Sequence, residues 1–393
     1  MRIPTFALSL STLLLASCGS AQSGDNAPAS TGNTPIAGTA VDAPAPFAAT
    51  SLGTFDEPWA IAFAPGTQVI FVTEKGGTMK FVDLPSGRVG TVSGLPQVAY
   101  GGQGGLGDVA FLASEASPTL DRRTIYLTWA GQAGDARAAM MGRGTLVCEE
   151  ADACRIEGLE EIWRQQPAVA SPGHFSHKIA FSPDGEHLFL SSGDRMQGTP
   201  AQALDNNLGK VLRLNLDGTP AAGNPFADRG GVAREIWSYG HRNLLGLAFD
   251  LDGQLWDLEH GPRGGDEINE VERGANYGWP VRSNGDDYSG APIPDHTADD
   301  GFSKPAIYWT PVIAPGDFVF YSGKLWPAWR GQALIANLGS QSFVRVALSG
   351  GKGTEEARIG FGKRLRDIAE GPDGALYIAE DGKGGRLLRL TPR

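Results

Sequence analysis

Four segments of the chain repeat one local pattern: a turn, a short run of alternating apolar and polar residues, a Gly/Asp-rich break and a second such run. They read APGTQVIFVTEKGGTMKFV from Ala64, SPDGEHLFLSSGD from Ser182, DLDGQLWDLEHG from Asp250 and GPDGALYIAEDGKGGRLLRL from Gly371. The Asp-Gly and Pro-Asp-Gly elements supply the positive φ and the Asx turns of tight hairpins. The runs that follow alternate at the period of two that indicates strands. An internal repeat of this kind limits the fold to arrays of one supersecondary unit.

The spacing of these segments predicts how many units there are. Pro65 and Pro183 are 118 residues apart, Pro183 and Leu251 are 68 apart, and Leu251 and Pro372 are 121 apart. Two intervals are about twice the third, so each should contain a weaker copy, and residues 123–129 and 331–337 are the candidates. Six units of roughly 60 residues without long helices predict an all-β fold, a six-bladed β-propeller of four-stranded antiparallel blades over residues 47–393. A pair of β-sandwiches is the alternative.

The N-terminal residues predict export. Met1-Arg2 precedes an apolar run that is too short to span a bilayer, and the run ends in Leu15-Ala16-Ser17-Cys18, which resembles a bacterial lipobox. We therefore expect a lipoprotein signal peptide over residues 1–17 and a lipidated Cys18; an ordinary signal peptide is the alternative. Residues 18–46 are poor in large apolar side chains and are expected to form a flexible tether. The protein would then lie on the periplasmic side of the cell envelope, held to the membrane by lipid alone, and Gly19 favours the outer membrane slightly.

Charge and motifs exclude several functions. The net charge is −11, and Lys and Arg do not form long runs, so nucleic acid is not an expected partner. The chain has no Gly-x-Ser-x-Gly elbow, no GxGxxG sequence opening a helix and no P-loop, which argues against nicotinamide and ATP chemistry. Cys148 and Cys154 are candidates for a local disulfide in an oxidising compartment; free thiols or a metal pair are the alternatives.

Three groups of residues can carry chemistry. His174 precedes an expected strand, where a channel-facing loop would lie, and Asp194 follows the next strand and can orient such a base. His174 and His177 together form a weaker candidate for a zinc site. The stretch 235–280 contains Glu259, Asp266 and Glu267 among Gly-rich turns, which suits calcium, although carboxylates that brace turns are the alternative.

The third group is basic. Arg242, Arg364 and Arg366 stand out in an acidic chain, and the sequence KRLRD places Arg364 and Arg366 on the same side of an extended segment. Converging arginines suit an anionic, planar ligand, because the guanidinium group matches carboxylates in pairs. Ordinary salt bridges are the alternative.

These residues carry a resemblance. The sequences GGQGGLGDVAF, LGKVLRLNLDG, EIWSYGHRN, EHGPRGGDEIN, NYGWP and RLRDIAEGPDG resemble the soluble quinoprotein glucose/sorbosone dehydrogenase family, in particular its aldose sugar dehydrogenases, over about residues 47–393. The resemblance implies oxidation of an aldose sugar at C1 to the lactone with pyrroloquinoline quinone (PQQ) and Ca²⁺. It also implies transfer of electrons to an external acceptor, a small quinone or a cytochrome, by a monomer or dimer.

The resemblance also assigns roles to positions. His174 matches the base that takes the proton of the sugar C1 hydroxyl as hydride passes to the quinone. The residues that match cofactor contacts are Gln103, Arg242, Asn243, Tyr288, the loop Asn337, Leu338 and Gly339, and the segment Arg364, Leu365 and Arg366. The carbonyls of Gly261 and Pro262 match those that hold the calcium of the cofactor, and Glu267 with the Tyr277 carbonyl matches a further calcium site.

Two positions depart from the family pattern. Relatives carry a lysine in the loop that here reads Asn337-Leu338-Gly339-Ser340, and they carry Gly-Gly-Arg or Ser-Gly-Arg where this chain has Ser176-His177-Lys178. The first departure removes a cofactor cation and the second changes how His174 is held. Two other functions therefore remain open: a calcium-dependent lactonase or esterase on a similar propeller, and a non-catalytic binding propeller.

Overall fold

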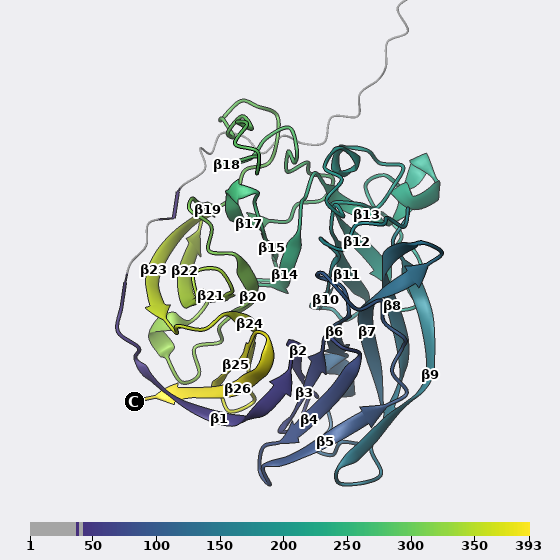
Figure 1. The fold of residues 1–393 in the computed structure, drawn as a ribbon, viewed down its shortest axis with the longest axis vertical. Coiled ribbons are helices and arrows are strands. Elements are labelled where there is room, and N and C mark those ends of the chain that lie inside the picture. Colours follow the sequence, from purple (N-terminus) through teal and green to yellow (C-terminus); the bar gives the residue numbers. More distant parts are fainter. Residues whose placement is uncertain (1–36, 39–41) are drawn as a thin grey trace, which may run out of the picture.

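The computed structural model describes residues 37–38 and 42–393. These residues form β-sheets joined by turns and short 3-10 helices, and none of them lies in an α-helix (Figure 1). The strands make four four-stranded sheets, one eight-stranded sheet and one two-stranded sheet. The prediction of an all-β fold is confirmed. The 3-10 helices are η1 (Ala113–Glu115), η2 (Thr199–Gln202), η3 (Ala227–Arg229), η4 (Gly231–Glu235) and η5 (Pro327–Trp329).

The eight-stranded sheet has the order β2-β3-β4-β5-β9-β8-β7-β6. Its strands are β2 (Pro58–Phe63), β3 (Val69–Glu74), β4 (Thr78–Asp83), β5 (Arg88–Ser93), β6 (Leu106–Phe111), β7 (Arg123–Ala133), β8 (Ala136–Val147) and β9 (Ala153–Arg164). All neighbours pair antiparallel except β5 and β9, which pair in parallel over three residues. The sheet therefore consists of two antiparallel runs, β2–β5 and β6–β9, joined at their outer strands.

The next two four-stranded sheets follow along the chain. One contains β10 (Ser176–Phe181), β11 (His187–Ser192), β12 (Lys210–Asn215) and β13 (Ile236–Tyr239). The other contains β14 (Leu244–Phe249), β15 (Leu255–Glu259), β17 (Asp266–Glu270) and β19 (Ile307–Trp309). The short strands β16 (Arg263–Gly264) and β18 (Gly285–Asp286) pair with each other beside it.

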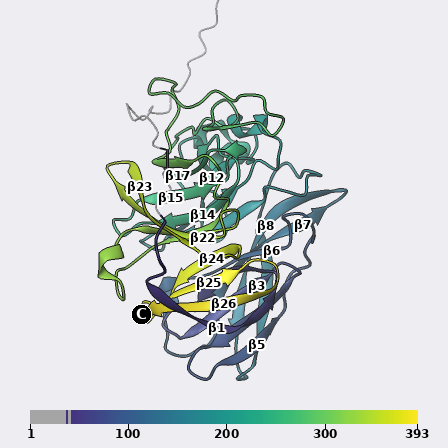
Figure 2. The same cartoon turned by 60° about the vertical axis from the view of Figure 1, so that its left-hand side comes forward.

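The last two sheets close the structure. One contains β20 (Pro315–Phe320), β21 (Ala333–Asn337), β22 (Ser342–Ser349) and β23 (Lys352–Gly360), and the other contains β24 (Leu365–Glu370), β25 (Leu376–Glu380), β26 (Lys383–Pro392) and β1 (Phe47–Asp56). The strand β1, which comes first in the chain, pairs antiparallel with the last strand β26 (Figure 2). This pairing joins the two ends of the domain in one sheet and leaves no gap between its first and last strands.

The innermost strands form a closed ring. The strands β2, β6, β10, β14, β20 and β24 each contact the next, and β24 contacts β2, so the sheets radiate from one axis (Figure 1). These strands read PWAIAF, LGDVAF, SHKIAF, LLGLAF, PGDFVF and LRDIAE. Each is six residues long, and each shows an irregular register against its neighbour near its third residue. Radiating sheets around a ring of inner strands define a β-propeller.

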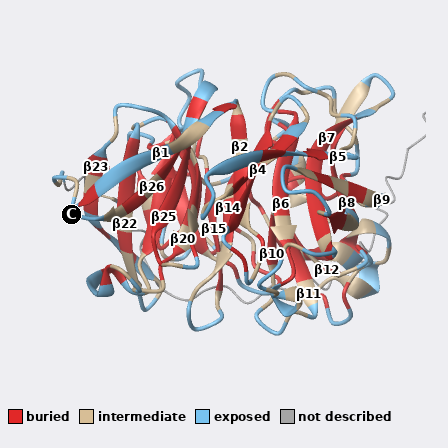
Figure 3. Cartoon of the chain, turned by 90° about the horizontal axis from the view of Figure 1, so that it is seen from below, coloured by how far each residue is buried: buried red, intermediate tan, exposed pale blue. Residues whose placement is uncertain are grey.

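The hydrophobic core lies between adjacent sheets. One cluster, for example, packs Phe71 and Phe81 of the β2–β5 run against Leu127 and Trp129 of the β6–β9 run. Figure 3 shows the buried residues along the strands and the exposed ones in the connections at both ends. Each Å² of apolar surface removed from water contributes about 25 cal/mol, and burial of these side chains holds neighbouring sheets together. The polar loops at the ends of the strands are left free to build a site.

The repeated segments of the sequence fall at equivalent places in the fold. Each of the four strong copies contains the connection from the first to the second strand of an antiparallel run, and residues 123–129 and 331–337 fall on β7 and β21, the second strands of theirs. The expected signal peptide and Cys18 lie outside the described residues. At the end of the expected tether, the Gly38 N–H donates to the Tyr308 carbonyl (2.5 Å) and the Ala43 N–H to that of Arg358 (3.0 Å).

Candidate active site

His174 lies in the turn that enters β10, close to the axis. Its side chain is buried, and Nδ1 lies 2.6 Å from Asp194 Oδ1. Asp194 follows β11, as the sequence predicts, and its other oxygen accepts a hydrogen bond from Trp279 Nε1 (2.7 Å). Burial opposes ionisation of Asp194, but its hydrogen bonds to His174 and Trp279 hold its pKa below the usual value. Asp194 is therefore a carboxylate that accepts the Nδ1 proton.

The imidazole of His174 is neutral at pH 7. Burial lowers its pKa, the contact with Asp194 opposes that shift, and the positive charge of Arg242 adds to it. Since Nδ1 carries the proton shared with Asp194, Nε2 holds the free lone pair, and Nε2 has no hydrogen-bond partner among residues 37–38 and 42–393. A histidine held in this way can act as a general base.

The backbone around His174 is held in an uncommon conformation. His174, Ser176 and His177 have φ values of 50°, 58° and 61°, in the left-handed region that costs a non-glycine residue about 1–3 kcal/mol. The His174 N–H donates to Gln103 Oε1 (2.7 Å), which places Gln103 beside the base. Arg195, fully buried, donates to the Gly173 carbonyl (2.9 Å) and lies 3.6 Å above the Phe175 ring.

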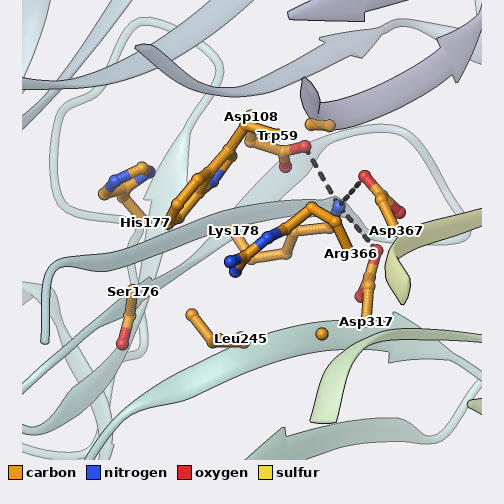
Figure 4. Close-up of a pocket in the computed structure, with 11 residues that line it drawn as sticks. Trp59, Asp108, Ser176, His177, Lys178, Leu245, Asp317, Arg366 and Asp367 are labelled. Carbon is orange, nitrogen blue, oxygen red and sulfur yellow. Dashed lines mark hydrogen bonds and ion pairs between the residues drawn. The ribbon is translucent and has the colours of Figure 1, made fainter. Parts of the chain in front are cut away.

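His177 and Lys178, where the resemblance implies other residues, lie in β10 and contact neighbouring sheets. His177 is buried, its Nδ1 lies 2.9 Å from Thr128 Oγ1, and burial lowers its pKa to about 3. Lys178 Nζ contacts Asp108 (3.1 Å), Asp317 (2.7 Å) and Asp367 (3.5 Å), each from the inner strand of a different antiparallel run (Figure 4). Neither of the two clusters of three or more possible metal ligands among the described residues contains His174 or His177, so the structure gives no support to a zinc pair there.

Arg242 and Asn243 enter β14 beside the base. Arg242 donates to the His260 carbonyl (3.0 Å) and to the Tyr288 hydroxyl (3.2 Å), and its guanidinium lies 5.1 Å from the Trp279 ring centre. Arg242 Nε and Asn243 Nδ2 are buried donors without a hydrogen-bond partner. Buried donors are almost always satisfied in native proteins, so this pair has the donors to meet the acceptor atoms of a ligand.

A cavity of about 280 Å³ opens near these residues. Of the predicted cofactor contacts, Gln103, Leu338, Arg364 and Arg366 line it; Trp59, Lys75 and His260, which the sequence reasoning missed, line it as well. Arg366 Nε donates to Asp381 Oδ1 (2.9 Å), and Arg364 Nε donates to Asp381 Oδ2 (2.7 Å). The two arginines therefore converge on one cavity, as predicted. Both also form salt bridges with Asp381, which was the alternative interpretation. Burial lowers the pKa of Arg366, and the negative charge of Asp381 opposes this shift.

The remaining predicted cofactor contacts, Arg242 and Asn243 among them, do not line this cavity. Leu365 packs in the hydrophobic core, and the Asn337 amide donates to the Ser342 carbonyl (3.1 Å). A side chain at Gly339 would bring its Cβ within 2.8 Å of the Ala314 Cβ. Gly339, in the loop where the resemblance implies a lysine, is therefore packed closely against its own neighbours in this chain. Tyr288, at 68% exposure, lies over Arg242 at the surface.

An acidic cluster lies behind Arg242. Asp257, Glu259 and Glu267 are buried around Asn269, whose Nδ2 lies 3.1–3.2 Å from an oxygen of each carboxylate. His241 Nδ1 lies 3.1 Å from Glu259 Oε1. Burial, followed by repulsion from Glu259, raises the pKa of Asp257 and Glu267 well above the usual range. Asp257 Oδ2, which lies 3.4 Å from His241 Nδ1, and Asn269 Oδ1 are buried acceptors without a hydrogen-bond partner. The cluster therefore has oxygen atoms to offer a cation.

Three of the four predicted calcium residues meet beside this cluster, and Pro262 does not line the same void. Gly261, Glu267 and Tyr277 line one small void together with Arg242 and Glu259. The Gly261 N–H donates to Asp266 Oδ1 (2.9 Å), and burial raises the pKa of Asp266 to about 7. Pro262 follows Gly261 in the same buried turn. Carboxylate and carbonyl oxygens are the ligands that calcium prefers.

Two features lie away from the site. Cys148 and Cys154 form a disulfide between β8 and β9. Among the described residues, no helix has the length and apolar character needed to cross a membrane.

Known proteins resemble this chain in sequence and in fold. The sequence profile of the glucose/sorbosone dehydrogenase family matches residues 55–389. The chain is 36% identical over 344 residues to the aldose sugar dehydrogenase YliI of Escherichia coli, which spans 86% of this chain and 91% of that one. The crystal structure of the soluble aldose sugar dehydrogenase from E. coli in the apo-form superposes with a TM-score of 0.81 at 34% identity, over 88% of this chain and 100% of that chain. The PQQ-bound form of an aldose sugar dehydrogenase from Streptomyces coelicolor, at 24% identity, shares the fold, with a TM-score of 0.71 over 89% and 100% of the two chains. The chain belongs to the glucose/sorbosone dehydrogenase family.

Proposed function

We propose that this protein oxidises aldose sugars at C1 to the lactone, with PQQ and Ca²⁺ as cofactors. Family membership and the similarity to aldose sugar dehydrogenases support an oxidoreductase acting on a sugar CH–OH group. The observation that carries the proposal for this chain is the oriented, neutral His174, whose neighbours Phe175 and Ser176 line a cavity together with three cations.

The residues present fit PQQ. PQQ is a planar tricarboxylate, and the cavity offers Lys75, Arg364 and Arg366 for carboxylates. The unpartnered donors Arg242 Nε and Asn243 Nδ2 suit its quinone oxygens. When bound, PQQ supplies the two-electron acceptor that the side chains of the protein lack. The lining residues therefore position an anionic, flat group next to the base.

His174 then performs the proton transfer. Its Nε2 lone pair accepts the proton of the C1 hydroxyl while the hydrogen at C1 leaves as hydride, so the sugar loses two electrons and becomes the lactone. Asp194 stabilises the imidazolium that forms, and it keeps the Nδ1 proton in place throughout. Gln103 and Arg195 hold the backbone of the turn, so the base keeps its position as its charge changes.

The acidic cluster and the Gly261 turn are the proposed calcium sites. Gly261 and Pro262 would offer carbonyls, and Glu267 and Tyr277 would offer a carboxylate and a carbonyl. A cation at these residues would also relieve the repulsion among the buried carboxylates Asp257, Glu259 and Glu267.

Several further features belong to the proposal. We count the runs β2–β5 and β6–β9 as separate blades, which gives six blades of four strands. The pairing of β5 with β9 is then a bridge between two blades.

Residues 1–17 would be a lipoprotein signal peptide, and Cys18 would carry the lipid at the periplasmic side of the envelope. Electrons would pass to an external small quinone or cytochrome, and the protein would act as a monomer or dimer.

One experiment separates this function from the alternatives. The purified protein is mixed with PQQ and calcium chloride, and glucose is added with an artificial electron acceptor. Sugar-dependent dye reduction that is lost in His174→Ala, with PQQ still bound, supports the proposal. Absence of PQQ binding would refute it. Hydrolysis of a lactone with calcium alone would favour the hydrolase, and binding of PQQ without turnover would favour the binding propeller.

A further inference from the structure

Lys75 is a cation of the cavity that no comparison assigns to binding. It lies in the turn between β3 and β4, is half-buried, and lines the same cavity as Arg364, Arg366 and Gln103. The sequence reasoning did not single it out, because a lysine at a hairpin turn is usually a solvated surface residue.

The backbone fixes the position of Lys75. Its N–H donates to the Glu57 carbonyl (3.0 Å), and its own carbonyl accepts from the Leu106 N–H (3.1 Å). Gly105 packs directly against that carbonyl, since a Cβ at Gly105 would lie 2.1 Å from the oxygen. The turn is thus held between β2 and β6, two strands of the inner ring, and the side chain leaves a rigid base.

The ammonium group of Lys75 is held in position and still has free hydrogen-bond donors. Nζ donates to the Gly102 carbonyl (2.6 Å) and lies 5.4 Å from the Tyr100 ring centre. An ammonium has three N–H donors, so two remain. Among residues 37–38 and 42–393, no carboxylate oxygen lies within the 4.0 Å of an ion pair with Lys75.

The other charges of the cavity are already paired. Arg364 and Arg366 both contact Asp381, and Glu57, the other acidic residue of the lining, accepts a hydrogen bond from the Tyr100 hydroxyl (2.6 Å). Lys75 is therefore the lining cation that has no acidic partner of its own. At Gly339 the approach of Ala314 leaves no room for a further cation.

We propose that Lys75 binds a carboxylate of PQQ through Nζ, as the third cation of the cofactor site. The inference rests on the proposed function, because it takes PQQ as the anion of this cavity. It adds that Lys75 supplies positive charge to the site. Arg364 and Arg366 do not supply this charge alone, because both pair with Asp381.

Equilibrium binding of PQQ tests the proposal without turnover. PQQ is titrated into the purified protein with calcium chloride present, and binding is followed by quenching of tryptophan fluorescence, since Trp59 lines the cavity. Loss of a charge-assisted hydrogen bond should weaken binding of PQQ to Lys75→Gln by about 10- to 100-fold. The Kd of Lys75→Gln should also depend less on salt than that of the wild type, because one screened charge is gone.

Two further variants separate charge from structure. Lys75→Arg keeps the charge and should bind PQQ within about 3-fold of the wild type. Lys352→Gln removes an exposed lysine at the start of β23, which does not line the cavity, and should leave the Kd unchanged. Equal weakening in Lys75→Gln and Lys75→Arg would overturn the proposal, since it would mean that Lys75 only supports the Gly102 loop. An unchanged Kd in Lys75→Gln would also overturn it. If the wild type binds no PQQ, the proposed function and this inference both fall.

Discussion

Replacement of Asp194 by Asn tests whether the carboxylate sets the protonation state of the base. Asp194 Oδ1 accepts from His174 Nδ1 (2.6 Å) and the Met196 N–H (2.8 Å), and Oδ2 accepts from Trp279 Nε1 (2.7 Å) and the Gly198 N–H (3.2 Å). An Asn amide can keep only one of these two faces. In the first orientation the amide NH₂ takes the place of Oδ2 and faces two donors, Trp279 Nε1 and the Gly198 N–H. In the second orientation the NH₂ takes the place of Oδ1 and faces the Met196 N–H and His174 Nδ1.

The second orientation costs less. It leaves one buried donor without an acceptor, at about 1–3 kcal/mol, whereas the first leaves two. The amide NH₂ then donates to His174 Nδ1, which moves the imidazole proton to Nε2 and removes the lone pair that accepts the substrate proton. We expect Asp194→Asn to lower kcat by about 10²- to 10⁴-fold, with PQQ still bound and stability lowered by about 1–3 kcal/mol.

The assay is dye-linked oxidation of glucose with saturating PQQ and calcium, together with thermal unfolding. Asp184→Asn is the matched control, because Asp184 is exposed in a hairpin turn where Asn makes the same local bond, and its kcat should equal that of the wild type. A kcat for Asp194→Asn within about 3-fold of the wild type would refute the role assigned to Asp194.

Three further outcomes are expected. Lys178→Met should lower the free energy of unfolding by about 3–5 kcal/mol, because it leaves buried carboxylates without their cation. Since burial raises the pKa of Asp108 and Asp317 and Lys178 opposes that shift, the loss should grow as the pH rises through the raised pKa values of these carboxyls, and a pH-independent loss in chemical denaturation would contradict this. The acid limb of kcat/KM should lie below about pH 6.5, since the pKa of His174 is lowered and activity needs its neutral form; a limb at pH 7 or above would contradict it. Removal of the disulfide in Cys148→Ser/Cys154→Ser should lower stability in thermal unfolding by about 2 kcal/mol, as expected for its short loop, and leave kcat unchanged.

The repeat in the sequence predicted the fold because each copy carries its own turn chemistry. The Asp-Gly turns and the alternating strands are local signals, so hairpins such as β10–β11 and β24–β25 can be read directly. The parallel pairing of β5 with β9 was not predicted, because it depends on two neighbouring sheets coming together. The recurrence of Ala-Phe at the ends of β2, β6, β10 and β14 was a signal for the inner ring that the sequence reasoning did not use.

The site was predicted in part. His174 and Asp194 could be paired because both lie at strand ends on the same side of one hairpin. The convergence of Arg364 and Arg366 followed from their spacing in an extended segment. Trp279, Arg195 and Lys75 were missed because their roles depend on contacts between distant segments, such as Trp279 with Asp194 across 85 residues.

The most direct test of the central claim is a single turnover without an electron acceptor. Protein loaded with PQQ and calcium is mixed with glucose or with glucose carrying deuterium at C1, and the absorbance of the quinone is followed. Reduction should be slower with deuterium, and in His174→Gln it should slow by at least about 10²-fold while PQQ stays bound. Reduction of His174→Gln at the wild-type rate, or no reduction of the wild type by the sugar, would contradict the account.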